Sequence, residues 1–377
     1  MKREILLTPG PVELHPRARL VLSGPQIHHR TEPARGAFLA VREGLKRAFG
    51  TEGEVLLLTT SGTGGMEAVA AGLFSPGERV LVPVSGKFSE RWAEIGEALG
   101  LSVVRLSFPW GEVLDPEAIA ARVTPDTRGL FLTHSETSTG VLNPVAEIAK
   151  AARERNPELL VVADAVTSLF LAPFALDAMG LDAAVSGSQK GLMLPPGLAF
   201  VALGNRALSA LKPRGYYLNL VRELESQRAG EGAYTPAIQL VLAAREVLSV
   251  LLPELDAHLE RKAHWNRSLY AIGEGLGLVP VPAKEGAPAP EAFQSPATAA
   301  FYLPEGVSQK ALTGAFLERG YRIAGGQGPL KGRIFRVSLM GHFAEGEVRR
   351  ILADVEAVLG EVLLNPDGPP RASRRSG

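Results

Sequence analysis

The 377-residue chain contains no cysteine, and this absence removes several kinds of chemistry at once. Disulfide bonds, thiolate nucleophiles and cysteine-ligated metals all need a cysteine side chain, so a desulfurase that uses a cysteine nucleophile is excluded. The seven histidines are scattered. His28 and His29 are adjacent, and His258 and His264 lack the i,i+4 spacing of a helical metal pair. We therefore predict no metal site.

An excess of charge and long apolar runs are also missing. Lys plus Arg and Asp plus Glu each number 40, so the formal net charge is zero. This balance gives no reason to expect nucleic acid or an anionic membrane as the main partner. No stretch approaches the roughly 18 to 20 apolar residues that a membrane span needs, and the first residues lack the apolar run of a signal peptide. We expect a cytoplasmic protein.

Short apolar runs alternate with helical patterns between about residues 55 and 204. Several runs are apolar throughout, which is typical of strands covered by helices on both faces. The pattern predicts an α/β domain with a mainly parallel, seven-stranded sheet. The predicted strands are residues 55–58, 79–84, 102–106, 129–133, 159–163, 183–186 and 198–203, with helices over residues 87–99 and 144–154 among the connections.

The C-terminal part of the chain has a different pattern. It predicts one long helix from residue 236 to about 272, then strands at 298–303 and 333–339 with helices between and after them. Because the chain is too long for one ordinary core, we predict a large domain of residues 15–255. A smaller α+β domain would consist of residues 1–14 and 256–364. The tail, residues 365–377, has turn formers without apolar periodicity and is predicted to be disordered.

Open α/β sheets bind ligands beyond the carboxyl ends of their strands, and Ser61, Gly62 and Thr63 follow the first predicted strand. At the start of a helix, exposed amides and the helix dipole favour an anion such as a phosphate. An ordinary helix N-cap is the alternative interpretation. The glycine spacing here matches neither the dinucleotide fingerprint nor a P-loop, which disfavours a nucleotide-binding oxidoreductase.

Two ionisable residues follow later strands. Asp164 would be buried at a strand end, where it needs a cationic or hydrogen-bonding partner. A protonated pyridine nitrogen could supply one, although an Asp that caps the next turn is the alternative. Lys190 precedes an apolar Leu-Met-Leu-Pro-Pro run, where desolvation would lower its pKa and make the amine nucleophilic. A solvated loop lysine is the alternative, and a non-catalytic interaction protein would need neither residue.

Five motifs together resemble the class V aminotransferases. In order they are TPGPVEL, TSGTGGMEA, THSETSTG, DAVTS and SGSQKGLMLPPG. The similarity is greatest to the group of alanine–glyoxylate and serine–pyruvate (or serine–glyoxylate) aminotransferases, and it extends over residues 6–363. The resemblance implies the type I fold of pyridoxal 5'-phosphate (PLP)-dependent transferases, a PLP cofactor and a homodimer with composite active sites.

The resemblance also implies a role for each matching residue. Lys190 would carry PLP covalently and serve as the catalytic base, and Asp164 would pair with the pyridine nitrogen. Val166 would pack under the cofactor ring and Phe88 would stack over it. The remaining matches are Ser61, Gly62, Thr63 and Gln189 for the phosphate, Thr137 near the ring hydroxyl, Thr235 for the phosphate of the neighbouring subunit, and Arg336 and Gly10 for the substrate.

The chain departs from the family pattern near Thr235. The family often has a tyrosine two residues earlier, where this chain has Ala233, while Tyr234 lies next to the threonine. Either Tyr234 reaches the phosphate after a local shift or that contact is missing.

The implied activity is ping-pong transfer of an amino group from a small amino acid, serine or alanine, to glyoxylate or pyruvate. Arg336 can bind one carboxylate, and no second arginine lies in a matched motif. Arg30 and Arg333 nevertheless leave aspartate or glutamate open as the donor. A PLP lyase of the same fold is a further alternative.

Overall fold

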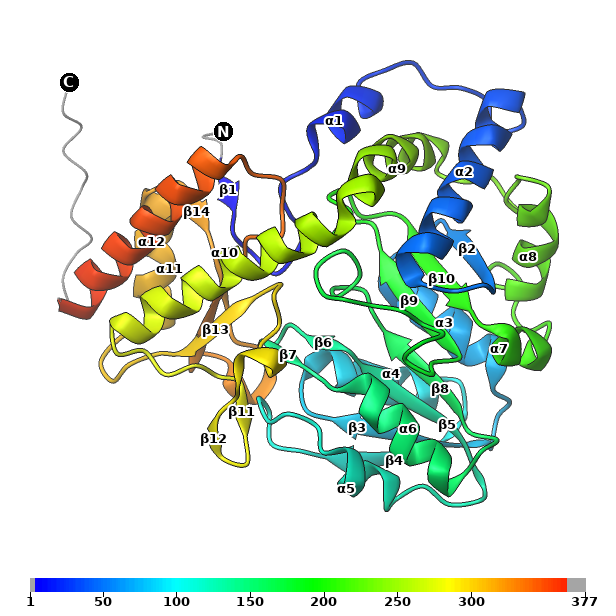
Figure 1. The fold of residues 1–377 in the computed structure, drawn as a ribbon, viewed down its shortest axis with the longest axis horizontal. Helices are drawn as coiled ribbons and strands as arrows, with labels where there is room; N and C mark the ends of the chain where they lie inside the picture. Colours follow the sequence, from blue (N-terminus) through cyan, green and yellow to red (C-terminus); the bar gives the residue numbers. More distant parts are fainter. Residues whose placement is uncertain (1–3, 365–377) are drawn as a thin grey trace.

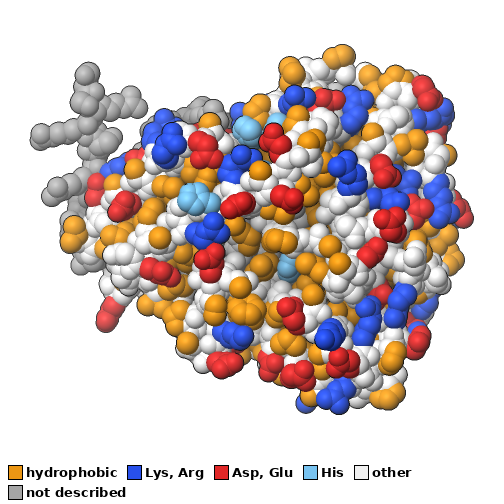
Figure 2. Space-filling model, in the orientation of Figure 1, with side chains coloured by type: hydrophobic (Ala, Val, Ile, Leu, Met, Phe, Trp, Pro, Cys, Tyr) orange, Lys and Arg blue, Asp and Glu red, His pale blue; other side chains and the backbone are white. Residues whose placement is uncertain are grey.

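The computed structural model describes residues 4–364, so the predicted disordered tail lies outside the described residues. A large sheet with helices on both faces forms one part of the molecule, and a smaller group of strands lies under the C-terminal helices (Figure 1). None of the helices within this range is long and apolar enough to cross a membrane. Figure 2 shows acidic and basic side chains interspersed over the face in view.

The seven-stranded sheet has the order β2-β10-β9-β8-β5-β3-β4. All of its strand pairs are parallel except those of β10, which is antiparallel to both β2 and β9. The predicted mainly parallel sheet is therefore confirmed. Its strands are β2 (Glu54–Leu58), β3 (Arg79–Val84), β4 (Ser102–Ser107), β5 (Thr127–Thr133), β8 (Leu160–Asp164), β9 (Ala183–Gly187) and β10 (Ala199–Leu203).

The strands are apolar throughout because both faces of the sheet are covered. Along β2, Val55 and Leu57 belong to one hydrophobic core, whereas Leu56 and Leu58 belong to a second, as the two-residue repeat of a strand requires. The helices that cover the first face include α2 (Glu32–Phe49), α6 (Val145–Arg155) and α9 (Ile238–Leu251), and those on the second include α3 (Gly62–Leu73) and α4 (Lys87–Ala98).

The predicted helix from residue 236 to 272 is two helices, so that prediction was wrong. After α9 comes a short 3-10 turn, η1 (Leu252–Glu254), and then α10 (Leu255–Gly275). The interruption includes Pro253, which has no N–H to donate and whose ring clashes with the preceding turn. In Figure 1, α10 extends from the large sheet to the smaller group of strands.

A separate hydrophobic core lies among the C-terminal elements, and Leu7 from the N-terminal segment is part of it. The segment also contributes a strand, β1 (Ile5–Leu6), which pairs with β14 (Tyr321–Arg322). We propose on this basis the division into residues 15–255 and residues 1–14 with 256–364. The other elements here include β13 (Ala299–Tyr302), β15 (Ala324–Gly325), β16 (Ile334–Val337), α11 (Gln309–Glu318) and α12 (Glu345–Leu364).

Candidate active site

A cavity lies at the carboxyl ends of the strands of the large sheet, beside the N-terminus of α3. Eight of the residues that the sequence singles out line it. Its lining residues are Ser61, Gly62, Thr63, Met66, Phe88, Arg91, Ser135, Asp164, Val166, Thr167, Gln189 and Lys190. The structure therefore brings together residues from four separate sequence motifs, as the rule for open α/β sheets predicts.

Lys190 is buried, and its Nζ donates a hydrogen bond to the carbonyl oxygen of Pro9. A Cβ atom on Gly10 would lie 2.5 Å from that Nζ, and Gly10 has a φ of +114°, so a glycine is required there. Burial lowers the pKa of Lys190 to about 8, with Asp164 acting in the opposite direction. A buried lysine of this kind has an appreciable neutral, nucleophilic fraction near neutral pH.

Asp164 is the last residue of β8 and is buried. Its Oδ1 accepts a hydrogen bond of 2.8 Å from the amide of Val166. Burial raises the pKa of Asp164 to about 7, and the nearby Glu136 raises it further. The site thus stabilises the charge of this carboxylate poorly by itself, so a cation such as a protonated pyridine nitrogen would gain a favourable partner.

The first turn of α3 is arranged to receive an anion. Ser61 is the N-cap, yet its side chain makes no capping hydrogen bond, so the hydroxyl does not serve as an ordinary N-cap. A Cβ on Gly62 would lie 2.7 Å from Cγ2 of Val166, and the glycine lets the helix start approach that side chain. Gln189 has a buried side-chain oxygen without a hydrogen-bond partner. Amides at a helix N-terminus with small flanking side chains suit a phosphate.

Arg336 reaches this region from β16. It is buried, its Nε and Nη2 donate to the carbonyl of Gly325 at 3.0 and 2.7 Å, and its Nη1 donates to the carbonyl of Thr137 at 2.8 Å. Burial lowers the pKa of Arg336 to about 10, opposed by Glu136, so the guanidinium is charged at neutral pH. Two of its five N–H groups remain for a carboxylate.

Four of the predicted site residues do not line the cavity: Gly10, Thr137, Thr235 and Arg336. Thr137 is buried and its Oγ1 has no hydrogen-bond partner, so it retains a donor for a bound group. Thr235 is exposed and lies beside Tyr217 and Tyr234 in a different pocket. The hydroxyl of Tyr234 donates to the carbonyl of Tyr216 at 3.0 Å. Within one subunit, neither Thr235 nor Tyr234 takes part in the cavity.

Sequence reasoning missed four residues that line the cavity, Met66, Arg91, Ser135 and Thr167, and the buried acid Glu136 close to it. Arg91 lines the cavity, donates from Nη1 to Oγ1 of Thr63 at 3.2 Å, and places its guanidinium 5.0 Å from the centre of the Phe88 ring. Its i,i+3 spacing from Phe88 on one helix was a usable signal. Glu136 is fully buried beside Thr137, and its position within the THSETSTG motif could have indicated a role.

Residues 19–272 match the family Aminotransferase class-V. The chain therefore belongs to the class V aminotransferases and is a transaminase, which confirms the resemblance carried by the five motifs.

Three similar proteins illustrate the relationship. A structure described as aspartate aminotransferase of subgroup IV from Thermus thermophilus has a TM-score of 0.91 and 56% sequence identity, covering 95% of this chain and 100% of that chain. An alanine–glyoxylate aminotransferase from Nostoc sp. has a TM-score of 0.86 and 29% identity, covering 95% and 96%. A protein of Anabaena cylindrica named "Soluble hydrogenase 42 kDa subunit" is 36% identical over 368 residues, which are 95% of this chain and 94% of that protein. The name of that last protein refers to a hydrogenase. The present chain contains no cysteine, so it cannot bind a metal through cysteine side chains.

The residues present fit PLP, the cofactor that this family and fold imply. The cavity offers a lysine with a lowered pKa, a carboxylate with a raised pKa and a helix N-terminus whose N-cap hydroxyl is unused. Two buried polar atoms near it, Oγ1 of Thr137 and Oε1 of Gln189, lack partners. Each of these groups matches one polar feature of the cofactor.

Proposed function

We propose that this transaminase uses PLP to pass an amino group from an amino acid to a 2-oxo acid in two successive half-reactions. The observation that carries the proposal is that Lys190 and Asp164 line the same cavity, where burial lowers the pKa of the lysine and raises that of the carboxyl. Perturbed groups of this kind concentrate at catalytic sites. When bound, PLP would supply an electron sink for the substrate α-carbon.

The chain's own residues divide the remaining work. Neutral Lys190 accepts the proton of the substrate α-carbon and later returns a proton as the acid. Asp164 keeps a proton on the pyridine nitrogen by offering it a buried negative charge. The two free N–H groups of Arg336 bind the substrate carboxylate and fix the orientation of the α-carbon. Phe88 and Val166 line the cavity and would pack against the two faces of the cofactor ring.

Two observations favour different amino donors. Besides Lys190, the one basic side chain that lines the cavity in the described subunit is Arg91, which already contacts Thr63 and Phe88. Arg30 and Arg333 are exposed and do not line it. This arrangement supports a donor with a single carboxylate, serine or alanine, and glyoxylate or pyruvate as the acceptor. The likeness to the Thermus thermophilus aspartate aminotransferase favours aspartate as the second candidate.

Single-turnover absorbance measurements with alanine, serine, aspartate and glutamate separate these candidates. We expect alanine and serine to convert the cofactor to its amine form at least about tenfold faster than aspartate, because a second carboxylate entering the cavity without its own cation costs more than 1.4 kcal/mol. A faster reaction with aspartate would make the small-amino-acid assignment wrong and favour the second candidate. The aminotransferase assignment would survive that result.

We further propose a homodimer in which Thr235 of each subunit reaches the partner's cofactor phosphate. Tyr216 is 71% exposed and Tyr217 is 47% exposed, and they form an aromatic patch with Tyr234 next to the exposed Thr235. Exposed aromatic patches of this kind mark association surfaces. Thr235 also lies outside the cavity of its own subunit.

We expect sedimentation to show a dimer at assay concentrations. Thr235→Ala should weaken PLP binding about tenfold, the effect of losing one charge-assisted hydrogen bond, whereas Thr313→Ala on α11 should leave it unchanged. A fully active monomer would contradict the composite site.

A further inference from the structure

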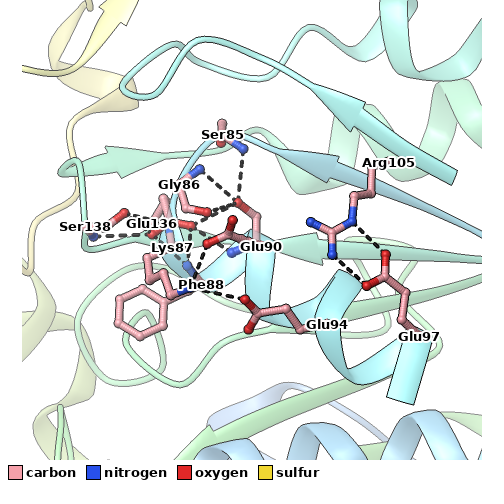
Figure 3. A network of polar contacts seen from close by, with 11 residues as sticks. Ser85, Gly86, Lys87, Phe88, Glu90, Glu94, Glu97, Arg105, Glu136 and Ser138 are labelled. Atoms are coloured by element: carbon pink, nitrogen blue, oxygen red, sulfur yellow. Dashed lines mark hydrogen bonds and ion pairs between the residues drawn. The ribbon is translucent and has the colours of Figure 1, made fainter. Parts of the chain in front are cut away.

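Glu136 is a fully buried acid, 0% exposed, in the short strand β6 (Ser135–Glu136). Its Oε2 accepts hydrogen bonds from the amides of Phe88 and Ser89 at 3.1 and 2.9 Å and from the hydroxyl of Ser89 at 3.1 Å. Its Oε1 accepts from the hydroxyl of Ser138 at 2.6 Å. Figure 3 shows these contacts meeting at the first turn of α4.

All of these partners are hydrogen-bond donors, which suits an ionised carboxylate. No lysine or arginine of residues 4–364 forms an ion pair with Glu136. An acid buried without an ion-pair partner is costly. The amides at the helix N-terminus compensate part of that cost, and the more distant charge of Arg336 acts in the same direction. A neutral residue would cap this turn without that cost, and stability alone therefore does not explain an acid here.

The acid replaces the side chain that normally caps a helix. The N-cap of α4 is Gly86, and a Cβ added there would clash with the carboxylate of Glu136. The missing side chain leaves room for a carboxylate that comes from a distant part of the chain. The backbone amide of Phe88 donates hydrogen bonds to this carboxylate. The position of the Phe88 ring, which lines the cavity, therefore depends on Glu136.

The same acid is linked to the substrate side of the site. Its neighbour Thr137 accepts the hydrogen bond from Nη1 of Arg336, the arginine assigned to the substrate carboxylate. The charge of Glu136 also favours the charged form of Arg336, opposing the lowering of its pKa by burial. Glu136 thus lies between Phe88, which faces the cofactor, and Arg336, which faces the substrate.

We propose that Glu136 is a positioning residue that holds Phe88 over the cofactor ring and Arg336 at the substrate carboxylate, and so couples the two binding subsites. The proposal rests on the proposed function, because the roles of Phe88 and Arg336 are taken from it. A residue that serves only as a helix cap would change stability and leave both binding constants unaltered.

The test compares Glu136→Gln with Glu97→Gln, and it needs no turnover. Glu97 lies on α4, the helix whose first turn Glu136 caps, and it pairs with Arg105 on the surface (Figure 3). Both variants therefore lose one negative charge from α4 or its cap. Affinity for PLP is measured by titrating the apoprotein and following absorbance. Affinity for propionate, which has the carboxylate of alanine without the amine, is measured on PLP-saturated protein. Melting temperature is recorded for each variant.

We expect Glu136→Gln to weaken PLP and propionate binding about tenfold each, the effect of losing charge-assisted hydrogen bonds that fix a binding group. Glu97→Gln should change both constants less than about twofold. A variant with a lower melting temperature and unchanged constants would show a helix cap only and overturn the proposal. A change in only one of the two constants would also overturn it, because the coupling would be absent.

Ser138→Ala provides the test if Glu136→Gln does not fold. It removes the hydroxyl that donates to Oε1 of Glu136 at 2.6 Å and leaves the acid in place. The affinities for PLP and for propionate should each weaken about threefold. If either affinity is unchanged, the proposal is overturned. A wild-type protein that binds no PLP would instead contradict the proposed function, which distinguishes the two failures.

Discussion

Lys190→Ala is expected to lower the rate of transamination at least about 10⁴-fold, the upper range for a positioned general base, while the protein still binds PLP. On the proposed function, the variant loses the amine that would carry the cofactor and move the substrate proton. The amides at the start of α3 and the carboxylate of Asp164 remain, and they hold the cofactor without a covalent bond.

Steady-state assays of 2-oxo acid formation measure the loss, and the absorbance of the dialysed protein reports retained PLP. Lys87→Ala is the matched control, because Lys87 precedes Phe88 in the sequence but does not line the cavity, and its side chain pairs with Glu90 and Glu94. It should keep nearly full turnover. A Lys190→Ala enzyme within about tenfold of the wild-type rate would show that another residue is the base.

Asp164→Asn is expected to reduce turnover by about 10² to 10³, the scale measured for removing one preorganised electrostatic group. A neutral amide cannot hold the proton of the pyridine nitrogen as a carboxylate does. PLP should still bind, because the proposed phosphate site at the start of α3 is unchanged. Near-normal turnover in this variant, measured at saturating PLP, would mean that Asp164 only caps the turn through the amide of Val166.

Although Asp164→Asn should reduce turnover, we expect it to increase the free energy of unfolding of the apoprotein. In the folded protein the pKa of Asp164 is raised to about 7 from its ordinary value of 3.8. The proton-linked stability is therefore fully present below about pH 4 and is lost as the pH rises through about 7. Asparagine avoids this loss. Urea unfolding should show the apo variant more stable than wild type by about 1 to 3 kcal/mol at about pH 8, and without that advantage near pH 4. A less stable variant at about pH 8 would indicate a structural role.

The sheet could be predicted closely because its strands are buried on both faces. Leu56 and Leu57 of β2 point to opposite cores, so this strand is apolar throughout. Turn residues mark its ends in the sequence. The helix prediction failed at Pro253 because the apolar pattern continues across the turn. The proline itself was a readable signal of a break.

Residues at strand ends could be found in the sequence, but contacts between distant segments could not. Asp164 and Lys190 follow buried strands, and the topology of a parallel sheet places such ends together. The contact of Pro9 with Lys190 joins residues 181 apart in sequence, and Glu136 caps a turn 48 residues away. Nothing in local periodicity distinguishes a buried acid of this kind from a surface one.

The central claim is that Lys190 carries PLP, and reduction of the protein with borohydride tests it most directly. Borohydride converts the bond between an amine and the cofactor aldehyde into one that survives digestion, so peptide mapping can locate it. We predict a yellow protein that loses its colour on reduction and yields the pyridoxyl adduct on the peptide containing Lys190. An adduct on a different lysine, or no adduct on a protein saturated with PLP, would contradict the account.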